Sequence, residues 1–301
     1  MIIGIDASCV SGVGGVSSYC NNLIDGLSAT GVGLSLYKRK YPGWNTIGLP
    51  LKLIYDKPDI FYTPEYFLPE YLPCPGIFTL HDISFETHPG WYDRRFLSYI
   101  IPRVRKSVKK CYKITTTTEF AAKEICDFYG LNSDKVIVTG GAVSNEFYNH
   151  GQNRSGVLFV GAMYSRRHVD LLIRACTACS EKLQLIGEKC GVNIPDNTAW
   201  VRTVTKKQLI AHMNNAALFV YLSEYEGYGF TVLEAMACGC PVLALPCGAI
   251  TEWAGTRIKY CAFGNVAERI KETIGIKQPD ACRFAMGQTP VKMAERFLKG
   301  L

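Results

Sequence analysis

The chain has 301 residues, of which 48% are hydrophobic, so it is long enough for one large domain or two of about 150 residues each. No run approaches the roughly 18 apolar residues of a membrane span, and the start of the chain, with its early Asp6, does not resemble a signal peptide. The net charge of +7 fits an anionic ligand or an anionic surface, and no nucleic-acid-binding motif accompanies it. We therefore expect a cytoplasmic protein that does not bind nucleic acid.

The first half of the sequence alternates predicted strands and helices. A strand over residues 1–6 leads into a glycine-rich loop with Gly12, Gly14 and Gly15, and then a helix over residues 17–27. Such a loop can cradle a phosphate, or it can be a tight turn without a ligand. Further strands are predicted at 34–37, 57–62, 76–80, 114–118 and 135–139, and further helices at 94–113 and 119–129. Residues 38–50 are rich in turn-forming residues.

His81 and Asp82 follow the predicted strand 76–80. A histidine at the carboxyl end of a parallel strand faces the usual ligand crevice, but a satisfied structural histidine explains the position as well. Asp82 either holds the imidazole or caps the next turn.

The predicted helix 94–113 is amphipathic and carries eight basic residues. A basic amphipathic helix can lie on anionic lipid. The alternative is a helix that packs on the core and exposes a solvated basic face.

The second half begins after a polar stretch, residues 150–155, which we interpret as a linker. Strands are predicted at 157–160, 183–186, 218–222 and 242–245, and helices from residue 169 and after Thr205, where Thr205 and Gln208 form a capping box. Two such series predict an α/β protein with two Rossmann-like, doubly wound parallel-sheet domains that face a cleft, over residues 1–150 and 151–278.

The chain contains 13 scattered cysteines, which favour free thiols in a reducing compartment. Cys176 and Cys179 have a spacing found in zinc sites, but they fall in a predicted helix without a histidine partner nearby in sequence. We therefore expect no metal site.

Residues 218–245 read LFVYLSEYEGYGFTVLEAMACGCPVLAL, which predicts a strand, a loop, a helix and a second strand. Thr231 is the expected helix cap, Gly239 the expected stop, and Pro241 cannot continue the helix. The amino end of this helix suits an anion such as a phosphate. Thr231 and Glu234 also have the spacing of a capping box, which would explain Glu234 without a ligand.

Two adjacent arginines, Arg166 and Arg167, follow the predicted strand 157–160 and Gly161. Two guanidinium groups there offer several fixed donors to a diphosphate. The alternative is a pair of solvated loop arginines. For Glu226 the corresponding alternative is a solvated loop glutamate.

Glu226 and Glu234 are separated by seven residues within EYEGYGFTVLEAMACGCPVLA. This segment resembles the E-x7-E signature of retaining glycosyltransferases with the GT-B fold, family 4, the group 1 and mannosyltransferase-like type. The segments TLHDISFETHPGWY and TTTTEFAAKEI also resemble that family. The resemblance implies that residues 1–150 lie on the acceptor side, that 151–278 bind the nucleotide sugar, and that the helix within 279–301 packs back on the first domain.

The resemblance also implies roles for individual residues. His81 would reach the donor sugar and phosphate, Arg166 and Arg167 would neutralise the diphosphate, Glu226 would bind sugar hydroxyls and Glu234 the ribose. Arg167 replaces the usual lysine, which keeps the charge and changes the geometry. The expected donor-binding residues, besides Glu234, are Gly14, Gly15, Gly161, Tyr228, Gly229, Phe230 and Thr231.

We therefore predict a retaining, metal-independent glycosyltransferase that moves a hexose from a UDP- or GDP-linked sugar to a glycan, lipid-linked or small-molecule acceptor, without a further cofactor. The helix 94–113 would give it a peripheral contact with an anionic membrane at its inner face. The alternatives are a GT-B-fold epimerase or phosphorylase, and a non-catalytic nucleotide-sugar-binding protein. An actin-like sugar kinase, suggested by GIDAS, lacks a second matching phosphate loop.

Overall fold

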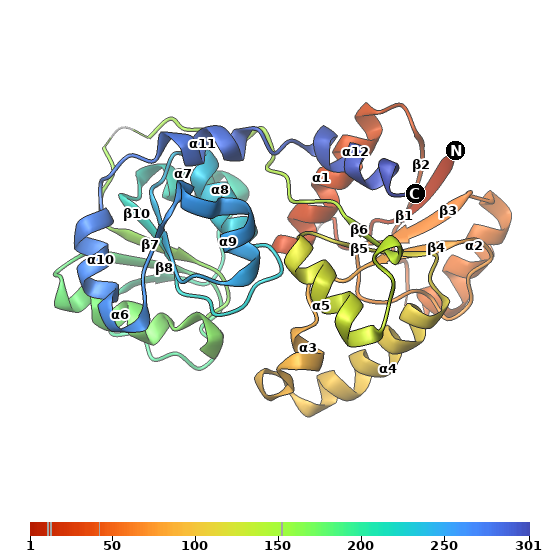
Figure 1. Ribbon diagram of the computed structural model, residues 1–301, viewed down its shortest axis with the longest axis horizontal. Helices are drawn as coiled ribbons and strands as arrows, with labels where there is room; N and C mark the ends of the chain where they lie inside the picture. The colour runs from red at the N-terminus through yellow and green to blue at the C-terminus, as the bar shows by residue number, and fades with distance from the viewer. Residues whose placement is uncertain (11, 13, 42, 152) are drawn as a thin grey trace. The chain divides into compact units, whose positions relative to one another are not determined.

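The computed structural model describes residues 1–10, 12, 14–41, 43–151 and 153–301. The chain divides into two compact units (Figure 1). The first contains Met1–Ala142 and Thr289–Leu301, and the second contains Val143–Gln288. Gln152, inside the predicted linker, lies outside the described residues.

The first unit is built on a six-stranded parallel sheet with the order β2-β1-β3-β4-β5-β6. Its strands are β1 (Ile2–Asp6), β2 (Gly33–Tyr37), β3 (Ile60–Thr63), β4 (Gly76–Thr79), β5 (Lys113–Thr116) and β6 (Val136–Val138). Its helices are α1 (Gly15–Ala29), α2 (Leu49–Asp56), α3 (Ser84–Thr87), α4 (Arg94–Lys110), α5 (Glu119–Tyr129) and α12 (Pro290–Lys299).

One face of this sheet is covered by α1 and α12, which come from opposite ends of the sequence and lie side by side (Figure 1). Gly26 of α1 permits the contact, because a Cβ there would lie only 2.0 Å from the backbone oxygen of Pro290. On the same face, the ring of Tyr62 meets the ring of Phe297 edge to face at 5.2 Å. The last helix of the chain thus packs on the first unit.

The opposite face of the sheet packs against α2 and α4. Phe61, Phe78 and Ile114 point to this face and share one core cluster with residues of both helices, namely Leu49, Leu53, Ile100, Val104 and Val108. The predicted turns over residues 38–50 are only partly correct, because a π-helix (Trp44–Gly48) runs directly into α2. The predicted helix 94–113 is too long at its carboxyl end, because α4 stops at Lys110 and Lys113 begins β5.

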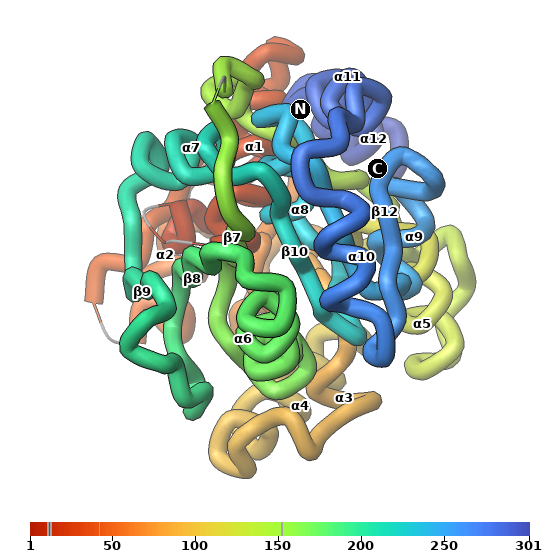
Figure 2. Tube along the Cα trace, turned by 90° about the vertical axis from the view of Figure 1, so that its left-hand side faces the viewer, coloured from red at the N-terminus to blue at the C-terminus, as the bar shows by residue number. Residues whose placement is uncertain are grey.

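The second unit contains another six-stranded parallel sheet, with the order β12-β11-β10-β7-β8-β9. Its strands are β7 (Val157–Val160), β8 (Leu183–Ile186), β9 (Ala199–Val201), β10 (Leu218–Tyr221), β11 (Val242–Ala244) and β12 (Lys259–Tyr260). Its helices are α6 (Val169–Ala178), α7 (Lys206–Asn215), α8 (Phe230–Ala237), α9 (Gly248–Ala254), α10 (Val266–Thr273) and α11 (Pro279–Met286). Figure 2 shows α6 and α10 side by side over this sheet.

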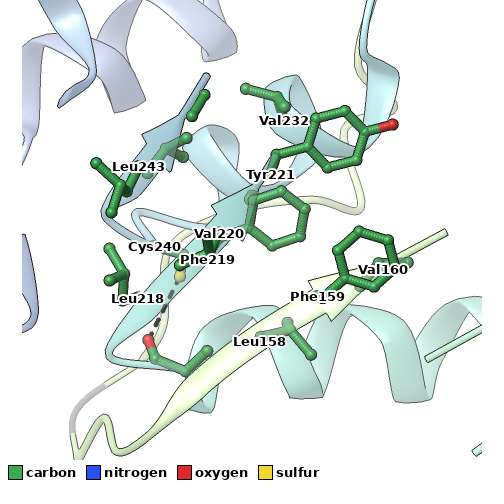
Figure 3. Packing of buried hydrophobic residues seen from close by; sticks show 14 of the residues in the cluster. Leu158, Phe159, Val160, Leu218, Phe219, Val220, Tyr221, Val232, Cys240 and Leu243 are labelled. Carbon is green, nitrogen blue, oxygen red and sulfur yellow. Dashed lines mark hydrogen bonds between the residues drawn. The ribbon is translucent and has the colours of Figure 1, made fainter. Parts of the chain in front are cut away.

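The central strands of the second unit are buried on both faces, as is usual in parallel sheets, and therefore read as continuous apolar runs. Figure 3 shows β7 and β10 in this core, with the rings of Phe159 and Tyr221 stacked at 6.1 Å. The buried thiol of Cys240 donates to the carbonyl oxygen of Ala216 at 3.4 Å. The predicted α/β architecture with two doubly wound parallel sheets is confirmed.

All 13 cysteines are free thiols. Within the described residues, no cluster of three or more histidine, cysteine, aspartate or glutamate side chains could hold a metal ion. None of the described helices has the length and apolar character needed to cross a membrane.

Candidate active site

Two loops meet at the carboxyl edge of the second sheet. Arg167 lies in a 3₁₀ turn, Ser165–Arg167, after β7, and Glu226 lies in the loop between β10 and α8. Because β7 and β10 are neighbouring parallel strands, their carboxyl ends bring these loops together. The loops are also tied by their backbones, since the amide of Glu224 donates to the carbonyl of Arg166 at 3.0 Å.

Arg167 and Glu226 form a buried ion pair. Nε and Nη2 of Arg167 lie 3.0 Å and 2.9 Å from Oε1 of Glu226, and the two side chains are only 13% and 12% exposed. Nη1 of the same guanidinium donates to the carbonyl of Ala162 at 3.0 Å. All three nitrogens of Arg167 are therefore engaged, and the guanidinium is fixed in one orientation.

Both side chains stay ionised because the attraction between their opposite charges outweighs the cost of burying each charge. Burial lowers the pKa of an arginine, but the charge of Glu226 overcomes it, so that the pKa of Arg167 is raised above its usual value. Burial raises the pKa of a carboxyl, yet the charge of Arg167 and the hydroxyl of Tyr221 hold the pKa of Glu226 below its usual 4.5. The positive charge of Arg166 acts in the same direction on Glu226.

Tyr221 and Ser223 complete the surroundings of Glu226, and neither was predicted as a site residue. The hydroxyl of Tyr221 donates to Oε1 at 2.8 Å and the hydroxyl of Ser223 at 2.9 Å. Tyr221 reads as a core residue at the end of an apolar strand. One feature of the sequence could have predicted its role: Tyr221 has a polar hydroxyl and lies at the carboxyl end of a predicted strand, five residues before Glu226.

Gly161 lets Arg167 approach the end of β7. Its φ is +145°, and a Cβ on it would lie 2.6 Å from Nη1 of Arg167. Gly187, at the end of β8, has φ +140° and packs against the same turn, because its added Cβ would lie 2.0 Å from the carbonyl oxygen of Gly161. Both positions require glycine for reasons of conformation and space.

Helix α8 begins at a different residue from the one predicted. Its N-cap is Gly229, in the left-handed region with φ +88°, and Thr231 is the second residue of the helix. The predicted Thr231 cap is wrong, and so is the capping box between Thr231 and Glu234, because the left-handed backbone of Gly229 starts the helix two residues earlier than that box requires. The predicted stop at Gly239 is confirmed by its φ of +66°.

Tyr228 precedes the N-cap of this helix, whereas Glu234 lies inside the helix. The ring of Tyr228 stacks on Trp253 at 5.0 Å, and the indole nitrogen of Trp253 donates to the Tyr228 carbonyl at 2.7 Å. These contacts hold the residue that precedes the N-cap. Glu234 is buried in the second turn of α8.

Three predicted site residues belong to the first unit: His81, Gly14 and Gly15. His81 follows β4 and is buried; its Nε2 lies 3.3 Å from the carbonyl oxygen of Pro64. Because a carbonyl only accepts, Nε2 carries the proton in this contact and Nδ1 is left as an acceptor. Burial lowers the pKa of His81 to about 4, so the imidazole is neutral at pH 7. Asp82 bonds the next turn, since its Oδ1 accepts from the amide and hydroxyl of Ser84.

Gly14 is the N-cap of α1, with φ +108°, and Gly15 is its first residue. A Cβ on Gly14 would meet no atom within 4 Å. The helix connects to His81 through Tyr19, whose ring lies edge-on to the imidazole at 4.9 Å.

Both the sequence and the fold of the chain are similar to those of known proteins. Residues 154–274 match the family model of the glycosyl transferases group 1. The chain is 24% identical over 233 residues to the O-antigen chain mannosyltransferase B of Escherichia coli, covering 65% of this chain and 59% of that protein. It is 29% identical over 181 residues to an uncharacterized glycosyltransferase of Methanocaldococcus jannaschii, covering 56% of this chain and 50% of that one. The chain thus spans 50–59% of the length of these curated relatives.

Two solved structures extend the likeness in fold over nearly the whole chain. HepE of Anabaena, solved in complex with UDP and glucose, superposes with a TM-score of 0.72 at 14% identity, covering 99% of this chain and 98% of that one. Sucrose-phosphate synthase of Thermosynechococcus elongatus superposes with a TM-score of 0.69 at 14% identity, covering 99% and 94%. The chain therefore has the GT-B fold, and residues 154–274, within its second unit, match the group 1 glycosyl transferases.

Proposed function

We propose that the protein is a retaining, metal-independent glycosyltransferase that transfers a hexose from a UDP- or GDP-linked sugar. The observation that supports this most is the buried Arg167–Glu226 pair beside the amino end of α8, inside the region that matches the glycosyl transferases. Named relatives support the reaction class, since one is a mannosyltransferase and one structural neighbour was solved with UDP and glucose.

In this proposal the diphosphate of the donor is bound at the edge where the two loops meet. Arg167 is already matched by Glu226, so a diphosphate needs a second cation, and Arg166 supplies it. The partial positive charge at the start of α8, at Gly229, Phe230 and Thr231, adds to the attraction. Stabilising the leaving diphosphate with fixed donors lowers the barrier to transfer, and no metal is required for it.

Glu226 is the residue we propose for binding the donor sugar. Arg167, Tyr221 and Ser223 all donate to its Oε1, so the carboxylate is fixed and ionised, and the other oxygen, Oε2, is the one we propose for the sugar. An ionised oxygen in fixed position can accept from sugar hydroxyls. For Glu234, the proposed role is contact with the ribose; for Gly161 and Tyr228, it is to shape the donor site.

We propose a part in transfer for His81 as a neutral group. With a pKa of about 4, it does not carry a positive charge toward a phosphate at pH 7. Its Nδ1, left as an acceptor by the Pro64 contact, suits a sugar hydroxyl. Gly14 and Gly15, at the start of α1, would let a ligand approach the backbone closely.

The proposed acceptor is a glycan, a lipid-linked sugar or a small molecule, and α4 is proposed to contact an anionic membrane. The basic side chains of α4 are exposed, although two of them are paired, Arg105 with Glu86 and Lys106 with Glu70.

A thermal-shift screen with UDP-, GDP-, ADP- and dTDP-linked hexoses tests the donor, and incubation of the stabilising donor with and without acceptors tests the reaction. We expect one donor class to raise the melting temperature, transfer to continue in EDTA, and nuclear magnetic resonance of the product to show the anomeric configuration of the donor. Donor conversion without an acceptor would indicate an epimerase, and binding without turnover a non-catalytic nucleotide-sugar binder. If no nucleotide sugar stabilises the protein, the proposal is wrong.

A further inference from the structure

The helical segment 44–56 of the first unit exposes a row of large apolar side chains. Ile47, Leu51, Ile54 and Tyr55 are 63%, 61%, 45% and 81% exposed. Their spacing of four, three and one residues places them along one face of a helix. Apolar side chains gathered on one exposed helix face indicate an interaction surface more strongly than scattered ones do.

The inner face of the same segment packs in the core of the first unit. Trp44, Leu49 and Leu53 are buried in the core cluster of the first unit. The outer row is therefore not a misplaced core face, and its residues contribute little to the stability of the unit. An amphipathic surface helix would normally carry polar residues at these positions.

Exposed basic residues accompany this row in the sequence. Lys38, Lys40, Lys52 and Lys57, in and next to this segment in sequence, are exposed, and Asp56, the acidic residue among positions 38–57, is paired with Lys52. The ammonium of Lys52 lies 5.0 Å from the ring centre of Tyr55. Tyrosine and lysine together are typical of surfaces that sit at the boundary between lipid and water.

The exposed faces of α2 and α4 lie on the same side of the first unit. Both helices pack on the same face of the sheet, through the cluster that contains Phe61, Phe78 and Ile114, whereas α12 packs on the opposite face. Exposed on α4 are Arg94, Arg95, Arg103, Arg105, Lys106 and Lys109. One side of the first unit therefore carries an apolar row with nearby lysines and, beside it, a basic helix.

We propose that Ile47, Leu51, Ile54 and Tyr55 insert into the surface of a bilayer with anionic headgroups. We infer a bilayer as the partner from the charge of this side of the unit. The lysines near the row and the basic face of α4 attract anionic headgroups, and the apolar row inserts among the lipids. The inference extends the α4 contact proposed above to a specific insertion element. It does not depend on sugar transfer.

Flotation of the full chain with vesicles tests this proposal. The vesicles are phosphatidylcholine alone and phosphatidylcholine mixed with phosphatidylglycerol, and the variant is Leu51→Gln with Tyr55→Gln, which keeps helix propensity and removes apolar surface. We expect binding to the mixed vesicles and weak binding to phosphatidylcholine. The variant should need roughly tenfold more lipid for half-maximal binding.

The matched control is Ile276→Gln with Met286→Gln, which removes exposed apolar surface from the second unit. It should leave vesicle binding within about twofold of the wild type, because neither residue lies on the proposed surface. Absence of vesicle binding by the wild type, or equal binding by both double variants, would overturn the proposal. So would sedimentation showing that the row joins two copies of the chain. The donor-induced thermal shift of the Leu51→Gln/Tyr55→Gln variant reports separately on the proposed function.

Discussion

Nε and Nη2 of Arg167 both point at one oxygen atom of Glu226, Oε1, at 3.0 Å and 2.9 Å. The two residues come from loops that are 59 positions apart in sequence. Because the pair is buried, neither charge can be removed without exposing the other to a poorly solvating environment. The pair therefore contributes to the fold of the second unit as well as to the proposed donor site.

Replacing Arg167 alone should destabilise the protein more than replacing both partners. Arg167→Met leaves the Glu226 carboxylate buried without its cation and should cost about 3 kcal/mol of unfolding free energy. Arg167→Met with Glu226→Gln removes both charges and should recover much of that loss. Urea denaturation of the wild type, both single variants and the double variant measures the coupling. Additive losses would show that the two side chains do not depend on each other.

Gly161→Ala should disturb Arg167 and not only the backbone. The added Cβ would lie 2.6 Å from Nη1, so the guanidinium must move away from Oε1. We expect donor binding at least roughly tenfold weaker, because the site depends on fixed donors. Gly191→Ala is the matched control, with φ +88° and no atom within 4 Å of the added Cβ. If both variants bind the donor equally well, Gly161 does not hold Arg167 in place.

The hydroxyl of Tyr221 should contribute to stability through Glu226. Tyr221→Phe removes one donor to an ionised oxygen and should lower the unfolding free energy by about 1.5 kcal/mol. Tyr164→Phe is the control, since it removes a hydroxyl from an exposed ring near the same arginines. Denaturation curves of the two variants that coincide would contradict the assigned bond.

His81 should make the protein sensitive to mild acid. Its pKa is about 4 in the fold and near 6.5 in the unfolded chain, so the unfolded state binds more protons between these values. Stability is therefore fully present above pH 6.5 and falls as the pH is lowered, by about 3 kcal/mol at pH 4. His81→Gln should flatten this part of the curve of unfolding free energy against pH. An unchanged slope in the variant would show that His81 titrates normally.

The alternation of strands and helices was predictable because apolar runs bounded by glycine and proline are strong local signals. The helix at 44–56 was not, since Gly43, Gly48 and Pro50 read as turn formers. In the structure Pro50 lies in the first turn of α2, where it is tolerated, and a Cβ on Gly48 would lie 2.4 Å from the Trp44 ring. Local composition therefore predicts turns at a segment that becomes helical through its tertiary packing.

The same limit applies to the candidate site. Glu226, Arg166 and Arg167 could be predicted from motif and position. The ion pair between Arg167 and Glu226 depends on β7 lying beside β10, and local sequence does not predict the order of strands in a sheet. The N-cap of α8 is Gly229, because its φ is positive. Residue preference alone would place the N-cap at Thr231. The short edge strand β9 is largely exposed and carries no apolar alternation that would predict it.

Calorimetric titration with the stabilising nucleotide sugar tests the central claim most directly. The comparison is between the wild type, Arg167→Ala, and Arg174→Ala, which changes an exposed arginine paired with Asp170 on α6. We predict that Arg167→Ala weakens donor binding by at least roughly a hundredfold, since it leaves the Glu226 carboxylate without its cation beside the diphosphate, while Arg174→Ala leaves donor binding unchanged. Equal donor affinity in all three proteins would contradict the assignment of this edge of the second sheet as the donor site.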